Sequence, residues 1–303
     1  MNNSLLGHFC AVFTVFIWGI TFVSSKVILS ELTPVELLFD RFVLAFLGLT
    51  LFMRSFNLLK GFKLNLTCAA AAFFGITLYF CLENGALTYA PAANVCLIVS
   101  SAPLFVGIVD SIAGGGRLKA NFWIGFIFAF CGVACLSWNS LSLQLNPLGD
   151  LMSLLAALSW AFYNLCVKKI YESGVGAAKC TQILIFYSIL LTLPFFLFSP
   201  YELKAEVLCK PVIWSNLLFL ALVCSSLGFV TWNVALKFIG GVKTNIYLYG
   251  QPAITAVFAF FFIDEPITLY TAGGMILITL GLVISQNFKP DLLFKGKRKE
   301  QHG

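Results

Sequence analysis

Apolar runs about twenty residues long follow one another along almost the whole chain, with only short connections between them. A helix needs about 20 apolar residues to cross the roughly 30 Å hydrocarbon core of a bilayer. The chain has 303 residues, of which 60% are hydrophobic and only 11% are charged, whereas a soluble domain is usually about a quarter charged. We therefore predict an all-α integral membrane protein.

The apolar runs predict ten transmembrane helices. Prolines such as Pro34, Pro91 and Pro147 fall near the predicted helix starts, where a missing backbone N–H costs little. The connections leave no room for a soluble domain of any size. The predicted ranges are about 8–29, 34–54, 66–86, 91–112, 119–138, 149–170, 179–199, 213–237, 243–263 and 268–287.

The two halves of the chain share residues at regular spacings. Gly7, Trp18 and Lys26 recur as Gly149, Trp160 and Lys168 at an offset of 142, and Asn84 and Pro103 recur as Asn233 and Pro252 at 149. Each half has five predicted spans, an odd number, so the second half enters the membrane inverted. We predict a five-helix repeat at 1–138, a linker at 139–148, a second five-helix repeat at 149–288 and a basic tail at 289–303.

The basic residues predict the orientation. With the N-terminus inside, fifteen lysines and arginines lie on the inner side, and the outer side holds only Lys26, Lys204 and Lys210. Since cytoplasmic loops carry the excess of positive charge, we expect both termini in the cytoplasm and the chain in the cell membrane. The tail is suited to anionic lipid. No basic stripe interleaved with aromatic residues predicts nucleic-acid binding.

Polar side chains inside the apolar runs are the candidate functional residues. The segment from Glu83 to Pro103 carries several of them, and a counterpart runs from Trp232 to Pro252. Buried polar groups cost several kcal/mol each without partners, so such paired, proline-containing segments predict a binding region. The predicted substrate-binding residues are Trp18, Tyr79, Glu83, Asn94, Ser101, Trp160, Asn164, Ser226, Asn233, Tyr247 and Gln251.

Each of these residues also has a structural interpretation. Glu83 is a candidate for proton exchange because ionisable groups inside spans are functional by default, but it can equally be a wet interfacial carboxylate or a structural partner of Arg41. Trp18 and Trp160 offer apolar faces to a flat or cationic solute, and otherwise pack or contact lipid. The hydroxyl and amide side chains can instead join helices, at about 0.6 kcal/mol per bond.

A second group of charged residues predicts a structural or gating network. It consists of Lys26, Glu36, Asp40 and Arg41, in which Lys26 is placed to pair with Asp40 across the loop 30–33. Opposite charges that pair offset most of their desolvation cost. Pro103 and Pro252 each remove a helical hydrogen bond and are predicted hinges.

Catalytic patterns are missing from the sequence. It has no P-loop, no HExxH and no CxxC motif, and its two histidines, His8 and His302, lie near the ends. Nine of its ten cysteines lie in apolar runs, as expected of packing residues. We predict no cofactor, no metal and no enzymatic activity.

The sequence resembles the drug/metabolite transporter superfamily of the EamA type over essentially its whole length. The residues that carry the resemblance are Trp18-Gly19, Lys26, Arg41-Phe42, Ala86-Leu87-Thr88-Tyr89 with Pro103, Trp160 and Asp264-Glu265-Pro266. One departure is Gly114-Gly115-Gly116-Arg117, where the second half has the Glu-Pro turn. The resemblance implies a ten-helix exporter with a central cavity walled mainly by spans 1, 3, 4, 6, 8 and 9.

We therefore expect a secondary transporter that exports a small metabolite, such as an amino acid or a similar amphipathic solute, by alternating access. Proton coupling is left open. The alternatives are an efflux protein for drugs or organic cations and, from another class, a membrane enzyme or a non-transporting partner protein. The expected partners are a small-molecule substrate and the lipid bilayer, with a homodimer left open.

Overall fold

The computed structural model describes residues 3–115, 120–138, 147–198, 207, 210–264, 267 and 269–286, and its elements in these ranges are helical. Helices are expected of apolar segments in a bilayer because they satisfy every backbone N–H and C=O internally. Each predicted span coincides with helical residues to within a few positions. Much of the predicted linker (139–146) and the predicted tail (289–303) lie outside the described residues.

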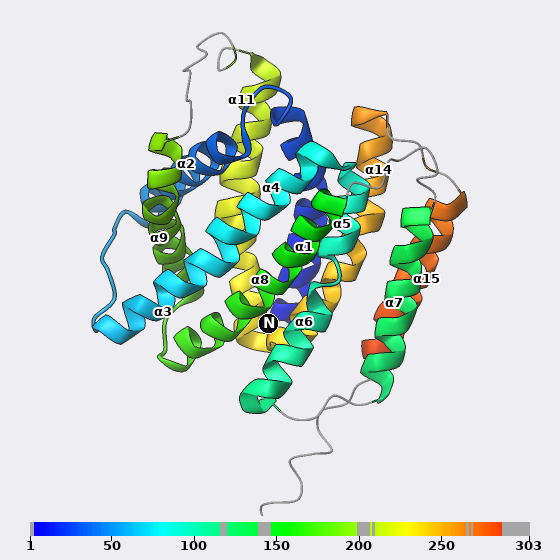
Figure 1. Cartoon of the computed structure of the whole chain (residues 1–303). Coiled ribbons are helices and arrows are strands. Elements are labelled where there is room, and N and C mark those ends of the chain that lie inside the picture. Colours follow the sequence, from blue (N-terminus) through cyan, green and yellow to red (C-terminus); the bar gives the residue numbers. More distant parts are fainter. Residues whose placement is uncertain are drawn as a thin grey trace, which may run out of the picture.

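The elements follow one another as in Figure 1. In the first half they are α1 (Asn3–Ile28), α2 (Pro34–Met53), α3 (Phe62–Ala72), η1 (Phe73–Leu78), α4 (Tyr79–Tyr89), α5 (Ala92–Val99), α6 (Ala102–Asp110), η2 (Ser111–Gly115) and α7 (Ala120–Trp138). In the second half they are α8 (Pro147–Glu172), α9 (Ala177–Phe198), α11 (Pro211–Leu218), η3 (Phe219–Leu227), α12 (Gly228–Ile239), α13 (Gly241–Ile246), η4 (Tyr247–Gly250), α14 (Gln251–Ile263) and α15 (Leu269–Gln286).

Seven helical segments of the described chain are long and apolar enough to cross a membrane. They are Asn3–Ile28, Phe62–Tyr89, Ala92–Gly114, Pro147–Glu172, Ala177–Phe198, Pro211–Ile239 and Gly241–Ile263. Helix α2 has 20 residues, but every stretch of 18 residues within it contains the three charged residues Glu36, Asp40 and Arg41. Shorter apolar helices lie in α7 and α15. The chain is a multi-pass membrane protein.

Corresponding elements of the two halves begin at a constant spacing. Helices α3, α4, α5, α6 and α7 begin 149 residues before α11, α12, α13, α14 and α15, respectively. A π-helical segment interrupts the third span of each half, as η1 and as η3. Such segments are rare and frequent at functional sites, and no residue pattern indicated them beforehand.

Each predicted hinge proline lies at the start of a helix that follows a break. Helix α5 ends before Ser100 and Ser101, and Pro103 lies in the first turn of α6. In the second half, the 3₁₀ turn η4 precedes Pro252, in the first turn of α14. Asn94 and Ser101 therefore do not lie on one face of an unbroken helix, because the helix is interrupted between them. The cause is Pro103, which has no N–H with which to continue the ladder.

The first helix of each half packs into the other half. Helix α1 contacts α12 and α14, whereas α8 contacts α3, α4 and α6. Figure 1 shows α1 inside the bundle, and it shows α7 and α15 side by side at one edge. This exchange brings Trp18 of α1 and Trp160 of α8 together near the middle of the molecule, with their ring centroids 5.6 Å apart.

Candidate functional site

A small cavity lies at the centre of the bundle, where both halves meet. Its volume is about 20 Å³, which is enough for one water molecule. Five of the predicted substrate-binding residues and one network residue converge on it. Its walls are formed by Trp18, Thr21, Phe22, Arg41, Tyr79, Phe80, Glu83, Trp160, Phe229 and Gln251.

Aromatic rings form most of the wall of this central cavity. The centroid of the Trp18 ring lies 5.6 Å from that of Trp160 and 5.0 Å from that of Trp232, and Tyr79 lies 5.1 Å from Trp160. The indole N–H of Trp18 donates to the Cys224 carbonyl at 3.0 Å. With its polar edge held in this way, the Trp18 ring presents apolar surface to an occupant of the cavity.

Two opposite charges face the same cavity. Arg41 is fully buried and Glu83 is 2% exposed. The Tyr79 hydroxyl is hydrogen-bonded to the Glu83 carboxyl, one helical turn away on α4. Burying a charge costs several kcal/mol unless partners replace its water, so the partners of these two side chains decide what the cavity can hold.

Three polar atoms at this cavity have no hydrogen-bond partner among the described residues. They are Nη1 and Nη2 of Arg41 and Oε1 of Glu83. An unsatisfied buried polar atom costs about 1–3 kcal/mol, and more when it is charged, so in native proteins such an atom normally has a water or a ligand. The central cavity therefore has the polar character of a binding site.

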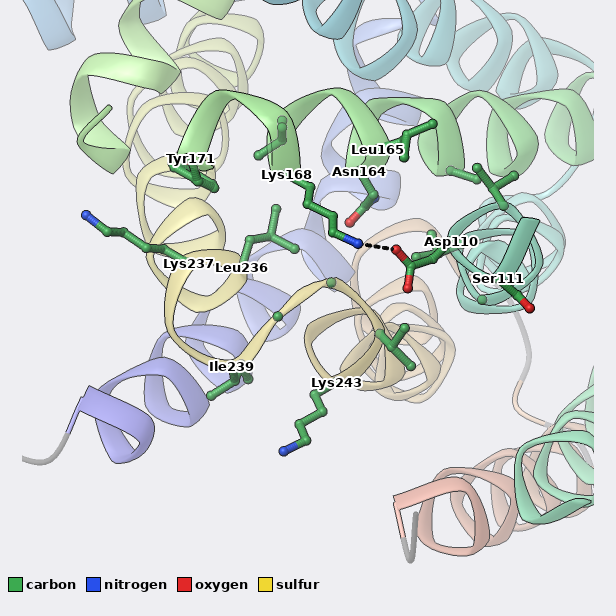
Figure 2. A pocket seen from close by; sticks show the side chains of 18 of the residues that line it. Asp110, Ser111, Asn164, Leu165, Lys168, Tyr171, Leu236, Lys237, Ile239 and Lys243 are labelled. Carbon is green, nitrogen blue, oxygen red and sulfur yellow. Dashed lines mark hydrogen bonds and ion pairs between the residues drawn. The ribbon is translucent and has the colours of Figure 1, made fainter. Parts of the chain in front are cut away.

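A second and larger cavity, which we call the vestibule, opens at one end of the bundle. Its volume is about 660 Å³, within the range of small-molecule sites. Its walls come from α6, η2, α8, α12 and α13. Figure 2 shows Lys168 reaching from α8 to Asp110 of α6, with Nζ 2.8 Å from Oδ1, whereas the Lys243 side chain points away from them.

A hydrogen-bonded partition, formed by Asn164, Asn245 and Trp160, separates the vestibule from the central cavity. The Asn245 amide donates to Oδ1 of Asn164 at 2.6 Å, and the Trp160 indole donates to Oδ1 of Asn245 at 2.8 Å. Asn164 lines the vestibule, and Trp160 lines the central cavity. Three neutral side chains thus stand between the two spaces.

The other predicted binding residues lie outside the central cavity. Asn233 accepts from the Tyr163 hydroxyl at 3.1 Å and donates to Thr181 at 2.9 Å, and Ser226 donates to the Ala45 carbonyl at 3.0 Å. Both are used in contacts between helices. Tyr247 is half-buried and hydrogen-bonded to His8, Asn94 is half-buried, and the Ser101 hydroxyl is buried with no partner among the described residues.

The predicted charge network is dispersed. Lys26 donates to the Ala90 carbonyl at 2.7 Å. Glu36 caps α2, because its carboxylate accepts from the Thr33 backbone N–H at 2.7 Å while its own N–H donates to the Thr33 hydroxyl, which is a capping box. Asp40 lies one turn beyond Glu36 on the same helix, and Arg41 alone reaches the central cavity.

Sequence reasoning missed two features of this site. The repeat does not indicate Asn245, because the equivalent residue at the offset of 149 is Cys96. Arg41, which the sequence places in a structural or gating network, also lines the central cavity, and an arginine deep inside an apolar helix is a sign of a special role. Among the described residues, no cluster of three His, Cys, Asp or Glu side chains could hold a metal ion.

The fold and these cavities define a class: a multi-pass membrane protein with a polar, aromatic chamber buried between two similar halves. The chain belongs to the EamA-like transporter family, which matches it twice, at residues 5–138 and 147–286. It is therefore a transporter-family protein.

Relatives and a solved structure resemble the chain over most of its length. An uncharacterized transporter of Archaeoglobus fulgidus is 26% identical over 288 residues, which cover 92% of this chain and 96% of the relative. A probable amino-acid metabolite efflux pump of Escherichia coli is 27% identical over 286 residues, covering 91% and 93%. A protein of known crystal structure superposes with a TM-score of 0.71 at 18% identity, covering 96% of this chain and 98% of that one, which shows a common fold.

Proposed function

We propose that the protein exports a small amphipathic metabolite, an amino acid or a similar solute, by alternating access. The observation that carries the proposal is the central cavity, where aromatic walls surround two buried, opposite and incompletely paired charges. An aromatic wall suits the apolar part of such a solute, and the charges suit its polar part. The similarity to an E. coli protein described as a probable amino-acid metabolite efflux pump supports this choice.

The transport cycle that we propose uses two inverted five-helix repeats in a ten-helix bundle. The constant spacing of 149 residues between equivalent helix starts supports this arrangement, as does the double match to one family. Inverted repeats let one site open to either side by rocking of one half against the other. The helix breaks before Pro103 and Pro252 lie at equivalent places and are the hinges of this proposal.

We place the vestibule on the cytoplasmic side of the cell membrane, together with both termini. Gly7 at the start of α1 packs against Phe238 and Ile239, and Ile239 lines the vestibule. The N-terminal end of α1 therefore lies beside the vestibule. Lys168, Lys237 and Lys243 line the same space, in agreement with the excess of positive charge on cytoplasmic surfaces.

In this account, the solute enters the vestibule from the cytoplasm and reaches the central cavity when the partition opens. The cavity of about 20 Å³ is too small for an amino acid, so the described conformation is closed at its centre. Breaking the bonds of Asn245 to Asn164 and Trp160 joins the two spaces. Glu83 is the candidate to carry a proton in the opposite direction, with Arg41, Tyr79 and Cys96 as its neighbours.

A second candidate function is the efflux of organic cations. The observation in its favour is the set of tryptophan rings next to a buried carboxyl group, which is a favourable environment for a cation. The presence of Arg41 in the same cavity argues against this function, because its guanidinium would repel a cationic solute.

The test is solute flux in liposomes that contain only the purified protein. Counting only flux above that of protein-free liposomes, we expect saturable efflux of radiolabelled L-phenylalanine or L-leucine, and none of labelled tetraphenylphosphonium. Trp18→Ala should abolish the flux, whereas Trp123→Ala should not, because Trp123 is 41% exposed on α7, away from the cavity. Tetraphenylphosphonium flux alone would support the second candidate, and no flux of any of the three solutes would contradict the proposal.

A further inference from the structure

The guanidinium group of Arg41 is held in a fixed orientation with its two terminal nitrogens unused. Its Nε donates to the Ser225 hydroxyl at 2.6 Å, and its central carbon lies 4.4 Å from the centroid of the Phe80 ring. Both Nη1 and Nη2 are buried without a hydrogen-bond partner among the described residues. Phe80 of the first half and Ser225 of the second half thus position this side chain. The edge of the guanidinium that carries Nη1 and Nη2 makes no hydrogen bond to the described residues and is available to a ligand.

That free edge has the geometry of a carboxylate site. The two terminal nitrogens of a guanidinium form a planar fork that binds both oxygens of a carboxylate through parallel hydrogen bonds. The acidic residue that lines the same cavity is Glu83. Since Oε1 of Glu83 and both Nη atoms lack hydrogen-bond partners, these atoms do not bond to one another.

We propose that Arg41 and Glu83 are the two poles of a subsite for a zwitterion, in which Arg41 binds a carboxylate and Glu83 binds an ammonium group. The inference rests on the proposed function and names its substrate class: α-amino acids with both groups free. The solute's side chain would lie against Trp18 and Trp160. A zwitterion satisfies both buried charges at once, which neither a simple cation nor a simple anion does.

The vestibule is compatible with the same class of solute. Its lining carries Lys168, Lys237 and Lys243 together with Asp110 and Glu172, so charges of both signs occur along the path to the central cavity. The partition between the two spaces is neutral. A solute with no net charge crosses such a barrier at a lower electrostatic cost than an ion does.

The first experiment varies the ligand and leaves the protein unchanged. Thermal stabilisation of the purified wild-type protein is measured with L-phenylalanine, L-phenylalaninamide, phenethylamine and 3-phenylpropionate. It is then measured with the corresponding leucine series of L-leucine, L-leucinamide, isoamylamine and 4-methylvalerate. A ligand that binds only the folded form raises the melting temperature. We expect at least one of the two amino acids to bind, and its three analogues to bind about 10- to 150-fold more weakly, as the loss of one charged hydrogen-bonding group implies.

The outcomes of this experiment separate the two proposals. Amide or amine ligands that bind as tightly as the amino acids would overturn the role of Arg41, while flux in liposomes would still support a transporter. If neither amino acid binds, the zwitterion subsite is wrong. A lack of flux for every solute would instead contradict the proposed function itself.

The second experiment replaces the guanidinium group of Arg41. Arg41→Lys keeps the positive charge but loses the planar pair of donors, and Arg41→Gln loses both. We expect about a 10-fold or greater loss of amino-acid affinity in each variant, with the weak binding of the amine analogue unchanged. Lys210→Gln, which removes an exposed lysine paired with Glu31, is the control. Equal losses of affinity for the amino acid and for the amine would show that Arg41 has a structural role and would overturn the inference. If the variants do not fold, the ligand series on the wild-type protein decides.

Discussion

Asn84 and Asn233 occupy equivalent positions in the two halves, yet their surroundings differ. Both are completely buried. Asn233 bonds to Tyr163 and Thr181 through its oxygen and its nitrogen, whereas neither polar atom of Asn84 has a partner among the described residues. At the scale of a single residue, the repeat therefore predicts where an asparagine lies along its helix but not which groups it bonds to. The hydrogen-bond partners come from neighbouring helices, whose residues differ between the two halves.

This difference predicts unequal effects of the same substitution. Asn233→Leu should lower the free energy of unfolding by about 1–3 kcal/mol, because it leaves the buried Tyr163 and Thr181 hydroxyls with fewer partners. Asn84→Leu should cost less, since it removes an amide whose own hydrogen bonds are not made within the described residues. Melting temperatures of the two purified variants against the wild type would measure this. A larger loss for Asn84→Leu would contradict the described contacts.

Glu83 carries the residue-scale prediction about coupling. If its carboxyl group takes up and releases a proton in each cycle, Glu83→Gln should make the transport rate independent of pH, because an amide does not titrate in this range. The measurement is solute efflux from liposomes at several external pH values. The matched control is Glu31→Gln, which removes an exposed carboxylate paired with Lys210. A pH profile unchanged in Glu83→Gln would rule out this residue as the proton carrier.

At the scale of the element, the sequence predicted where helices lie but not how they are broken. Apolar runs of about 20 residues identify transmembrane spans to within a few positions, because the thickness of the bilayer sets the length of each run. The π-helical segments η1 and η3 could not be predicted in this way, since they depend on how neighbouring helices pack. Pro103 and Pro252 did indicate the breaks, because the absence of an N–H is a local property.

Helices α7 and α15 give a prediction about close packing. A Cβ atom built on Gly281 of α15 would lie 2.6 Å from the Gly125 carbonyl oxygen and 2.7 Å from the Ala129 backbone nitrogen of α7. Since backbone atoms cannot rotate away, Gly281→Ala should separate these helices and cost about 1–3 kcal/mol.

The control for this prediction is another glycine of the same chain. Gly176 has no atom within 4 Å of the position of an added Cβ, so Gly176→Ala should change the melting temperature little. Comparison of the two melting temperatures in the same detergent is the measurement. Equal stability of the two variants would mean that α7 and α15 are farther apart than described.

At the scale of the whole molecule, the sequence predicted candidate residues but not which of them lie close together. Trp18, Tyr79, Glu83, Trp160 and Gln251 do line one central cavity. Asn94, Ser101 and Tyr247 do not, since convergence depends on helix rotation and tilt, which hydrophobic periodicity leaves undefined. The exchange of α1 and α8 between the halves was likewise invisible, although it is what brings Trp18 against Trp160.

The central claim is that one cavity between the two halves opens to each side of the membrane in turn. Thr21 lines this cavity and is 4% exposed, so Thr21→Cys in an otherwise cysteine-free, transport-active protein reports its accessibility. The measurement is the rate of labelling by a membrane-impermeant thiol reagent in right-side-out and inside-out vesicles. We predict slow labelling from both faces, further slowed by whichever amino acid is transported. Labelling from neither face, or from one face only with no effect of the solute, would contradict the account.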